Sequence, residues 1–178
     1  MNCICWNARG LSNARAFAEL CRLVKDHHPY ILFVCETKVA GHRCPGWKGK
    51  LGFKGHFVVD NQGKSGGLMM FWKDSVDITM KSYSRGHIDC GVLDQRKQWR
   101  FTGFYGNPDA RFRRFSWEFI RKLSDSDEEF GLPWVVRGDF NEVCLLSEKK
   151  EGAPRSFSQM KDFKDTLEET GIRDIHNE

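Results

Sequence analysis

The sequence predicts an α/β sandwich of two sheets, folded as a single domain over residues 1–178. Three observations support this prediction. A strand, helix, strand pattern opens the chain, short β-type runs fill its middle, and helical patterns lie on either side of a further strand after them. The length fits one core, and a hydrophobic content of 40% with 14 Phe and 6 Trp is enough to bury one.

The first 36 residues predict a βαβ unit. Residues 2–7 (NCICWN) alternate as a strand does and lead to a turn at Gly10. Hydrophobic residues then recur at helical spacing up to Pro29: Phe17, Leu20, Cys21 and Val24. Residues 30–36 (YILFVCE) form a continuous apolar run, which is typical of a strand covered on both faces. The two strands are therefore expected to lie side by side.

Residues 52–105 predict a meander of antiparallel strands. Glycine and aspartate separate the β-type runs, which span residues 57–60, 68–72, 76–83, 88–93 and 100–105. The pair Gly66 and Gly67 predicts a tight turn into one of these strands. A phosphate-binding loop is the poorer interpretation, because no GK[ST] sequence follows the pair.

The last third of the sequence predicts two helices and a strand. Residues 134–136 form a short buried strand, and Ser156 with Gln159 predicts a capping box for a helix that runs to Gly171. The other helix is marked by residues at helical spacing: Phe112, Phe115, Phe119 and Leu123.

Composition narrows the class of protein. The net charge of +4 is compatible with a polyanionic partner but does not require one. We expect neither secretion nor a membrane span, because no leader pattern is present and no apolar run approaches about 20 residues. Several of the seven cysteines lie inside apolar runs, which indicates reduced core thiols in an intracellular protein.

Polar side chains follow three of the predicted strands. Asn7, Glu36 and the pair Asp139 and Asn141 each come directly after an apolar run. Strand ends are where α/β proteins assemble sites, and carboxylate and amide oxygens suit Mg²⁺. Residues of these types also commonly cap helices or form turns. The residue types alone leave both interpretations open.

Taken in their order, Asn7, Glu36, Tyr105, Asp139 and Asn141 resemble the endonuclease/exonuclease/phosphatase family. The matching segments are WNARGL at 6–11, CETK at 35–38, SGGLMMFW at 65–72, FYGNPD at 104–109 and GDFNE at 138–142. CETK and GDFNE are specific when they occur together. The flanking segments look like the endonuclease of plant LINE-type non-LTR retrotransposons, and the resemblance covers nearly the whole chain.

This resemblance implies a four-layer α/β sandwich of two facing mixed sheets, DNase I-like, which lacks its last strands. It implies that Glu36 and Asn7 hold Mg²⁺, with Mn²⁺ as a possible substitute. Asp139 would orient or deprotonate the attacking water. Asn141 would hold that aspartate and the phosphate, and Tyr105 would contact the phosphate.

Three departures from the family pattern matter. Arg9 stands where DNA-repair relatives have an acidic residue, so it implies a thinner metal shell and a contact to a substrate phosphate. Asn107 lies one residue before the phosphate-binding Asn of those relatives and is a further substrate-binding candidate. Family members also end with an Asp-His pair that would lie beyond Glu178, and His176 comes too early for that role. The resemblance therefore implies a domain truncated at its C-terminus and impaired in catalysis.

The implied function is Mg²⁺-dependent hydrolysis of phosphodiesters by a DNA-nicking endonuclease. The implied partner is DNA, with basic residues at 111–114 and 148–155 as candidate backbone contacts. We expect a nuclear monomer that contacts no membrane, joined to a reverse-transcriptase domain if the gene is longer. Two alternatives remain open: an inactive retroelement-derived fragment that binds metal or DNA weakly, and a phosphatase acting on inositol phosphates or phospholipids.

Overall fold

The computed structural model describes residues 1–63, 65–126, 131–148 and 155–174. The chain forms two compact units. The first, here called the sheet unit, comprises Met1–Tyr105 and Pro133–Asp139. The second, here called the helical unit, comprises Gly106–Leu132 and Phe140–Glu178. None of the helices in the described residues is long and apolar enough to cross a membrane.

The first sheet of the sheet unit has the strand order β1-β2-β4-β3. Its strands are β1 (Cys3–Asn7), β2 (Ile31–Cys35), β3 (Gly55–Val59) and β4 (Leu68–Trp72). The helix α1 (Ala14–His27) connects β1 to β2, and these strands pair in parallel, which confirms the predicted βαβ unit. The pairs of β4 with β2 and with β3 are antiparallel. The sheet is therefore mixed.

The second sheet has the order β5-β6-β7-β8. Its strands are β5 (Asp77–Ser84), β6 (His87–Asp94), β7 (Lys97–Tyr105) and β8 (Trp134–Asp139). The first three strands run antiparallel, and β8 adds to β7 in parallel. The prediction of one continuous meander over residues 52–105 is wrong, because β4 pairs with β2 and the chain then leaves the first sheet to begin the second.

The two sheets pack face to face through apolar side chains. Phe33 and Met70 from the first sheet share one buried cluster with Ile88 and Phe101 from the second. The approach is closest at Gly103, where an added Cβ would lie 2.2 Å from Cδ2 of Phe33. This glycine is required by the spacing between the sheets rather than by a turn.

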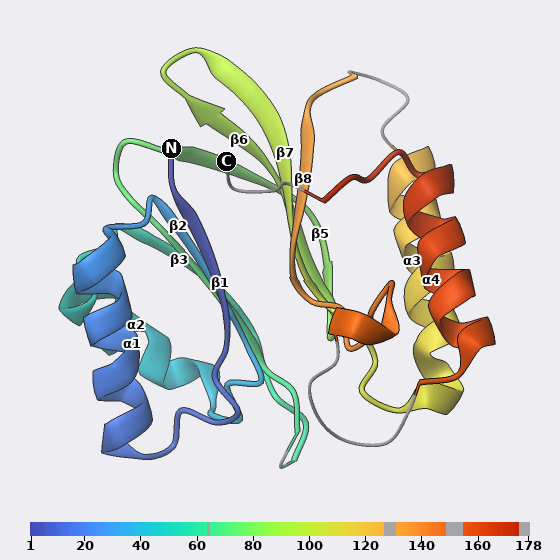
Figure 1. Ribbon diagram of the computed structural model, residues 1–178. Helices are drawn as coiled ribbons and strands as arrows, with labels where there is room; N and C mark the ends of the chain where they lie inside the picture. The colour runs from blue at the N-terminus through green and yellow to red at the C-terminus, as the bar shows by residue number, and fades with distance from the viewer. Residues whose placement is uncertain (64, 127–130, 149–154, 175–178) are drawn as a thin grey trace. The chain divides into compact units, whose positions relative to one another are not determined.

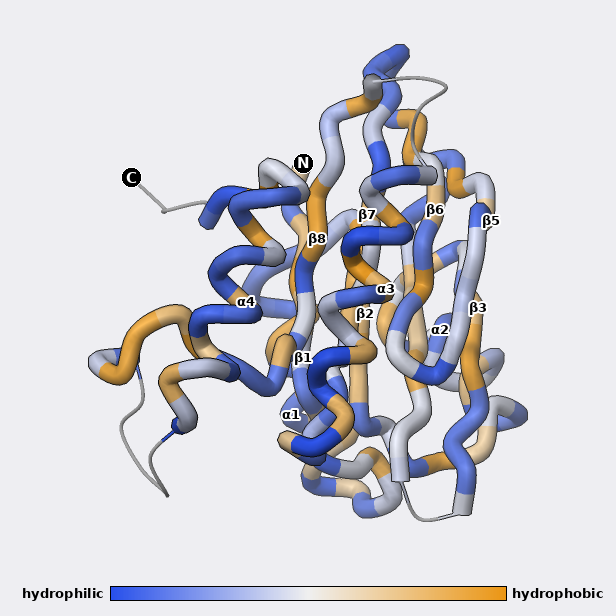
Figure 2. The backbone as a smooth tube through the Cα atoms, turned by 90° about the vertical axis from the view of Figure 1, so that its right-hand side faces the viewer, coloured by the Kyte–Doolittle hydropathy of each residue, from blue (hydrophilic) through white to orange (hydrophobic). Residues whose placement is uncertain are grey.

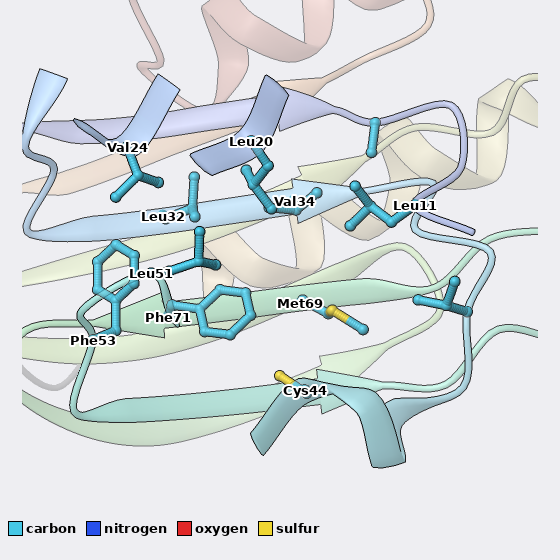
Figure 3. Close-up of a cluster of buried hydrophobic side chains, with 12 residues drawn as sticks. Leu11, Leu20, Val24, Leu32, Val34, Cys44, Leu51, Phe53, Met69 and Phe71 are labelled. Carbon is cyan, nitrogen blue, oxygen red and sulfur yellow. The ribbon is translucent and has the colours of Figure 1, made fainter. Parts of the chain in front are cut away.

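A second apolar cluster covers the outer face of the first sheet. Leu20 and Val24 of α1 and Cys44 of α2 (Cys44–Lys50) pack with Leu32 and Phe71 (Figure 3). Figure 1 shows both helices on this side of the sheet. All five residues of β2 are buried, as predicted for a strand covered on both faces.

The helical unit contains α3 (Arg113–Asp125) and α4 (Phe157–Glu169), whose hydrophilic and hydrophobic stretches alternate along the chain (Figure 2). The rings of Trp117 and Phe163 lie 4.5 Å apart and join the two helices.

Short 3-10 turns occur in both units. They occupy Gly41–Arg43, Ala110–Phe112 and Leu146–Glu148.

The predicted capping box at the start of α4 is wrong. Ser156 is the N-cap residue, but its side chain makes no capping hydrogen bond. Its hydroxyl instead lies 2.8 Å from that of Ser158, and Nε2 of Gln159 donates to the carbonyl of Ala110. Both side chains of the expected box therefore have other partners.

Candidate active site

Four of the predicted site residues lie at the carboxyl ends of strands in the sheet unit. Asn7 ends β1 and Glu36 directly follows β2. Tyr105 ends β7 and Asp139 ends β8. Tyr105 and Asp139 are also paired in the register of the second sheet. Two parallel strand pairs, one in each sheet, thus bring their terminal polar side chains to one place.

The amide of Asn7 joins the two carboxylates. Its Nδ2 donates to Oε1 of Glu36 and to Oδ2 of Asp139, both at 2.8 Å. The hydroxyl of Tyr105 donates to the same Oε1 of Glu36 at 2.9 Å. Two acidic side chains from different sheets are therefore held within reach of one another by neutral donors, an arrangement that favours a bound cation.

The ionisation states follow from these contacts. Burial raises the pKa of Glu36, but hydrogen bonds from Asn7, Tyr105 and Lys38 outweigh burial and bring that pKa below its ordinary value. Burial, together with the neighbouring Glu36 carboxylate, raises the pKa of Tyr105. At neutral pH the site therefore contains an ionised Glu36 and a neutral Tyr105 that can donate a hydrogen bond.

Lys38 belongs to the site, although the sequence analysis did not single it out. Its Nζ lies 3.4 Å from Oε2 of Glu36, the oxygen that does not accept from Asn7 or Tyr105. The side chain of Lys38 is 36% exposed, so the cation can reach solvent or a phosphate. Its position in the CETK segment, two residues after a candidate metal ligand, was the available signal.

The backbone around Glu36 is unusual. Arg9, Glu36 and Lys38 have φ of 48°, 52° and 54°, in the left-handed region that residues other than glycine seldom adopt. Hydrogen bonds hold the segment: the amide of Lys38 donates to Gly66, and the carbonyl of Thr37 accepts from Leu11. Strained backbone of this kind is concentrated at functional sites, where the surrounding structure maintains it.

Gly138 sets the position of Asp139. It has φ of 157°, and an added Cβ would lie 1.7 Å from the carbonyl oxygen of Phe104 on β7. Only glycine allows β8 to approach β7 this closely at the residue before the carboxylate. The glycine of the GDFNE segment is therefore explained by packing.

The other predicted residues are placed as follows. Arg9 contacts Asn7 through its backbone, since its amide donates to Oδ1 of Asn7 at 3.0 Å, and its side chain is exposed. Asn107 and Asn141 lie in the helical unit. Oδ1 of Asn107 accepts from the amide of Asp109, and Nδ2 of Asn141 donates to the carbonyl of Gly106.

Two of the sequence predictions fall outside the described residues. His176, considered as a catalytic histidine, is one of them. Residues 149–154, which form most of the second candidate DNA contact, are the other.

The donor set is compatible with a hard divalent cation. Glu36 and Asp139 offer carboxylate oxygens and Tyr105 a phenol oxygen, whereas soft metals prefer sulfur ligands. No group of three or more His, Cys, Asp or Glu side chains suited to a metal occurs in the part of the chain that the structure describes. Two carboxylates with further positions left to water are sufficient for a hard divalent cation.

Comparison with known proteins decides the family. The profile of the Endonuclease/Exonuclease/phosphatase family matches residues 4–174. The chain belongs to this family. Among curated proteins, none matches the sequence.

Several solved structures share the fold. The endonuclease domain of TRAS1, a telomere-specific non-LTR retrotransposon, matches 95% of this chain with a TM-score of 0.67 and 16% identity. The AP endonuclease LMAP from Leishmania major matches 94% with a TM-score of 0.68 and 15% identity. A 3' phosphatase from Neisseria, solved with a product DNA hairpin, matches 94% with a TM-score of 0.65 and 17% identity. These similarities confirm the predicted α/β fold of two mixed sheets.

The chain is shorter than the proteins it matches. It covers 70% of the TRAS1 and Neisseria chains and 66% of the Leishmania chain. Of the human Nocturnin catalytic domain it covers 64%.

Proposed function

We propose that this chain carries the Mg²⁺-dependent phosphodiesterase site of a DNA-nicking endonuclease. The observation that carries the proposal is the pair of carboxylates, Glu36 and Asp139, held by the amide of Asn7 at the ends of β1, β2 and β8. An ionised Glu36 suits a cation, and the neutral Tyr105 beside it suits an anionic phosphate. Together these groups match the charges of a metal-assisted phosphodiester hydrolysis.

Each residue has a role in this proposal. Glu36 would hold the metal, and Asn7 supports both carboxylates through its two donated hydrogen bonds. The metal supplies Lewis-acid stabilisation of charge on the phosphate oxygens. Asp139 orients the attacking water and accepts its proton as the new P–O bond forms and the bond to the leaving oxygen breaks. Tyr105 donates to a phosphate oxygen.

Three further residues are assigned to the substrate. Asn141 and Asn107 present amides to the phosphate, and the exposed guanidinium of Arg9 contacts the DNA backbone. Lys38 pairs with Glu36, and its exposed ammonium would also be able to contact the phosphate. A cation would compete with Lys38 for Glu36, and a phosphate would compete with Glu36 for Lys38.

We further propose that the enzyme is of the retrotransposon type found in plant LINE elements. The supporting observations are the WNARGL, CETK and GDFNE segments and the shared fold of the TRAS1 endonuclease domain. A monomer acting on nuclear DNA, joined to a reverse-transcriptase domain in a longer gene product, fits this proposal.

Nicking of supercoiled plasmid tests the function. We expect conversion to open circles with Mg²⁺, none with a chelator, and a loss of at least about 10²-fold in Asp139→Asn, since a missing base typically lowers the rate by that much. Asp26→Asn, on the exposed end of α1, is the matched control and should nick at the parental rate. Release of phosphate from inositol phosphates without nicking would replace the proposal with a phosphatase. Mg²⁺ binding with neither reaction would indicate an inactive fragment.

A further inference from the structure

A buried ion pair lies in the helical unit. Arg113, the first residue of α3, and Glu142 of the GDFNE segment have side chains that are 4% and 0% exposed. Nη1 of Arg113 donates to Oε2 of Glu142 at 2.9 Å. Both residues come from segments that carry a proposed phosphate ligand, Asn107 or Asn141.

Arg113 uses its other nitrogens to hold the segment after β7. Its Nε donates to the carbonyl of Asn107 at 3.3 Å and its Nη2 to the carbonyl of Pro108 at 3.0 Å. The guanidinium of Arg113 thus donates three hydrogen bonds, which reach two segments of the chain. The backbone amide of Asn107 also donates to the hydroxyl of Ser116 on α3, which further fixes this segment.

Glu142 and Arg155 hold the other segment. Oε1 of Glu142 accepts from the amide of Val143 and lies 3.4 Å from Nε of Arg155. Nη2 of Arg155 donates to the carbonyl of Asn141 at 3.3 Å. Glu142 therefore lies between two arginines, and each of them also contacts the backbone of an asparagine assigned to the substrate.

The two segments meet at Gly106. Nδ2 of Asn141 donates to the carbonyl of Gly106 at 2.8 Å, and an added Cβ on Gly106 would lie 2.1 Å from the carbonyl of Phe140. Asn141 itself has φ of 57°. The left-handed backbone of Asn141 and the direction of its side chain are thus maintained where the two segments held by Arg113 and Glu142 meet.

Stability alone is a poor explanation for this pair. Burying two charges is unfavourable, and apolar replacements of similar volume are often neutral or stabilising. The hydrogen bonds from Arg113 to two carbonyls are directional, however, and no apolar side chain could replace them. These directional contacts are suited to fixing the geometry of the backbone segments that they join.

We propose that Arg113 and Glu142 are positioning residues, which hold the amides of Asn141 and Asn107 in the orientation that stabilises the phosphate in the transition state. The proposal rests on the proposed function only for the roles of these two asparagines. The positioning itself is a property of the helical unit and can be measured without a substrate.

The decisive variant is the double substitution Arg113→Met with Glu142→Leu, which removes both charges and keeps similar volume. In the parental 178-residue chain, the side-chain amide protons of Asn141 should exchange slowly with water by NMR. In the double variant we expect a cooperative thermal transition, at least about tenfold faster exchange of those protons, and a fall in kcat for nicking of about tenfold or more with KM within about twofold. Arg121→Met, which breaks the α3–α4 ion pairs to Asp162 and Glu169, should leave both readouts at parental values.

A folded double variant with parental exchange and parental kcat would overturn the proposal. If the double variant does not fold, Arg113→Lys is used in its place. Its ammonium keeps the charge beside Glu142 but cannot also reach both carbonyls, so faster exchange at Asn141 is again expected and parental exchange again contradicts the proposal. If the parental chain nicks no DNA, the proposed function fails, while amide exchange still decides whether Arg113 and Glu142 position Asn141.

Discussion

The hydroxyl of Tyr105 donates to Oε1 of Glu36 at 2.9 Å, a bond between the last residue of β7 in one sheet and the residue after β2 in the other. Together with the hydrogen bond from Asn7 to Asp139, this contact links the facing sheets at the candidate site. It also contributes to the lowered pKa of Glu36 and the raised pKa of Tyr105. The contact between the two sheets therefore affects the ionisation of Glu36, the carboxylate proposed to bind a cation.

Tyr105→Phe should change the pH dependence of metal binding. The phenol hydrogen bond lowers the pKa of Glu36, so its removal should raise that pKa. Mg²⁺ binding requires the ionised carboxylate and should therefore be lost at a higher pH in the variant as the solution is acidified. Calorimetric titration with Mg²⁺ between about pH 4 and pH 7 measures this shift. Superimposable pH profiles for parent and variant would refute the coupling.

His87 should make the fold sensitive to acid. It is 2% exposed, its ring nitrogens lie 2.9 and 2.7 Å from the hydroxyls of Ser82 and Ser84, and burial lowers its pKa to about 4. The unfolded chain, with a histidine pKa of about 6.5, takes up a proton that the folded protein does not. The stability contributed by the neutral ring is thus present above about pH 6.5 and is lost as the pH falls toward 4, on the order of 2–3 kcal/mol.

Urea unfolding at several pH values measures this loss. His87→Gln keeps a polar side chain but cannot take up the proton, so its unfolding free energy should fall less between about pH 6.5 and pH 4 than that of the parent. Parallel curves for the two proteins would show that His87 does not carry the effect.

Gly103→Ala should destabilise the contact between the sheets. Its Cβ would lie 2.2 Å from the ring of Phe33, which is fully buried and cannot move aside, so we expect a loss of about 1–3 kcal/mol. Gly46→Ala in α2 is the control, since an added Cβ there meets nothing within 4 Å, and it should raise stability by about 0.5–1 kcal/mol. Thermal melts followed by circular dichroism compare the two, and equal transitions would contradict the packing of the sheets.

Addition of a downstream segment tests a prediction made from the family resemblance. An Asp-His pair supplied C-terminal to Glu178 should stabilise charge on the reacting phosphate. Because one such electrostatic contact is typically worth about 10²–10³ in rate, the extended chain should nick faster by about that factor. The segment with its histidine changed to alanine is the control. Equal nicking rates for the chain with and without the segment would remove this histidine from the mechanism.

Much of the fold could be predicted from local patterns. The run at Leu68–Trp72 has the predicted bounds, and the βαβ start follows from its periodicity. The helix α2 was missed because its sequence, CPGWKGK, contains two glycines and no apolar repeat. The division of the middle strands between two sheets was missed for another reason: the pairing of β4 with β2 depends on contacts distant in sequence.

The candidate site could be predicted in composition but not in geometry. Asn7, Glu36 and Asp139 follow apolar runs, but it was their order along the chain and the family resemblance that identified them. The sequence gives no sign that Asn7 donates to both carboxylates, because that contact joins strands from different sheets. The left-handed backbone at Glu36 and Lys38 also could not be predicted from the sequence, since neither residue type favours it.

Mg²⁺ affinity tests the central claim most directly. Calorimetric titration compares the parent, Glu36→Gln and Glu19→Gln, the last an exposed carboxylate on α1 that pairs with Arg15. We predict that Glu36→Gln binds Mg²⁺ at least about tenfold more weakly with an unchanged circular dichroism spectrum, because it removes a ligand charge at a strand end and no core contact. Glu19→Gln should bind as the parent does. A Glu36→Gln protein that binds Mg²⁺ with parental affinity would contradict the account of this site.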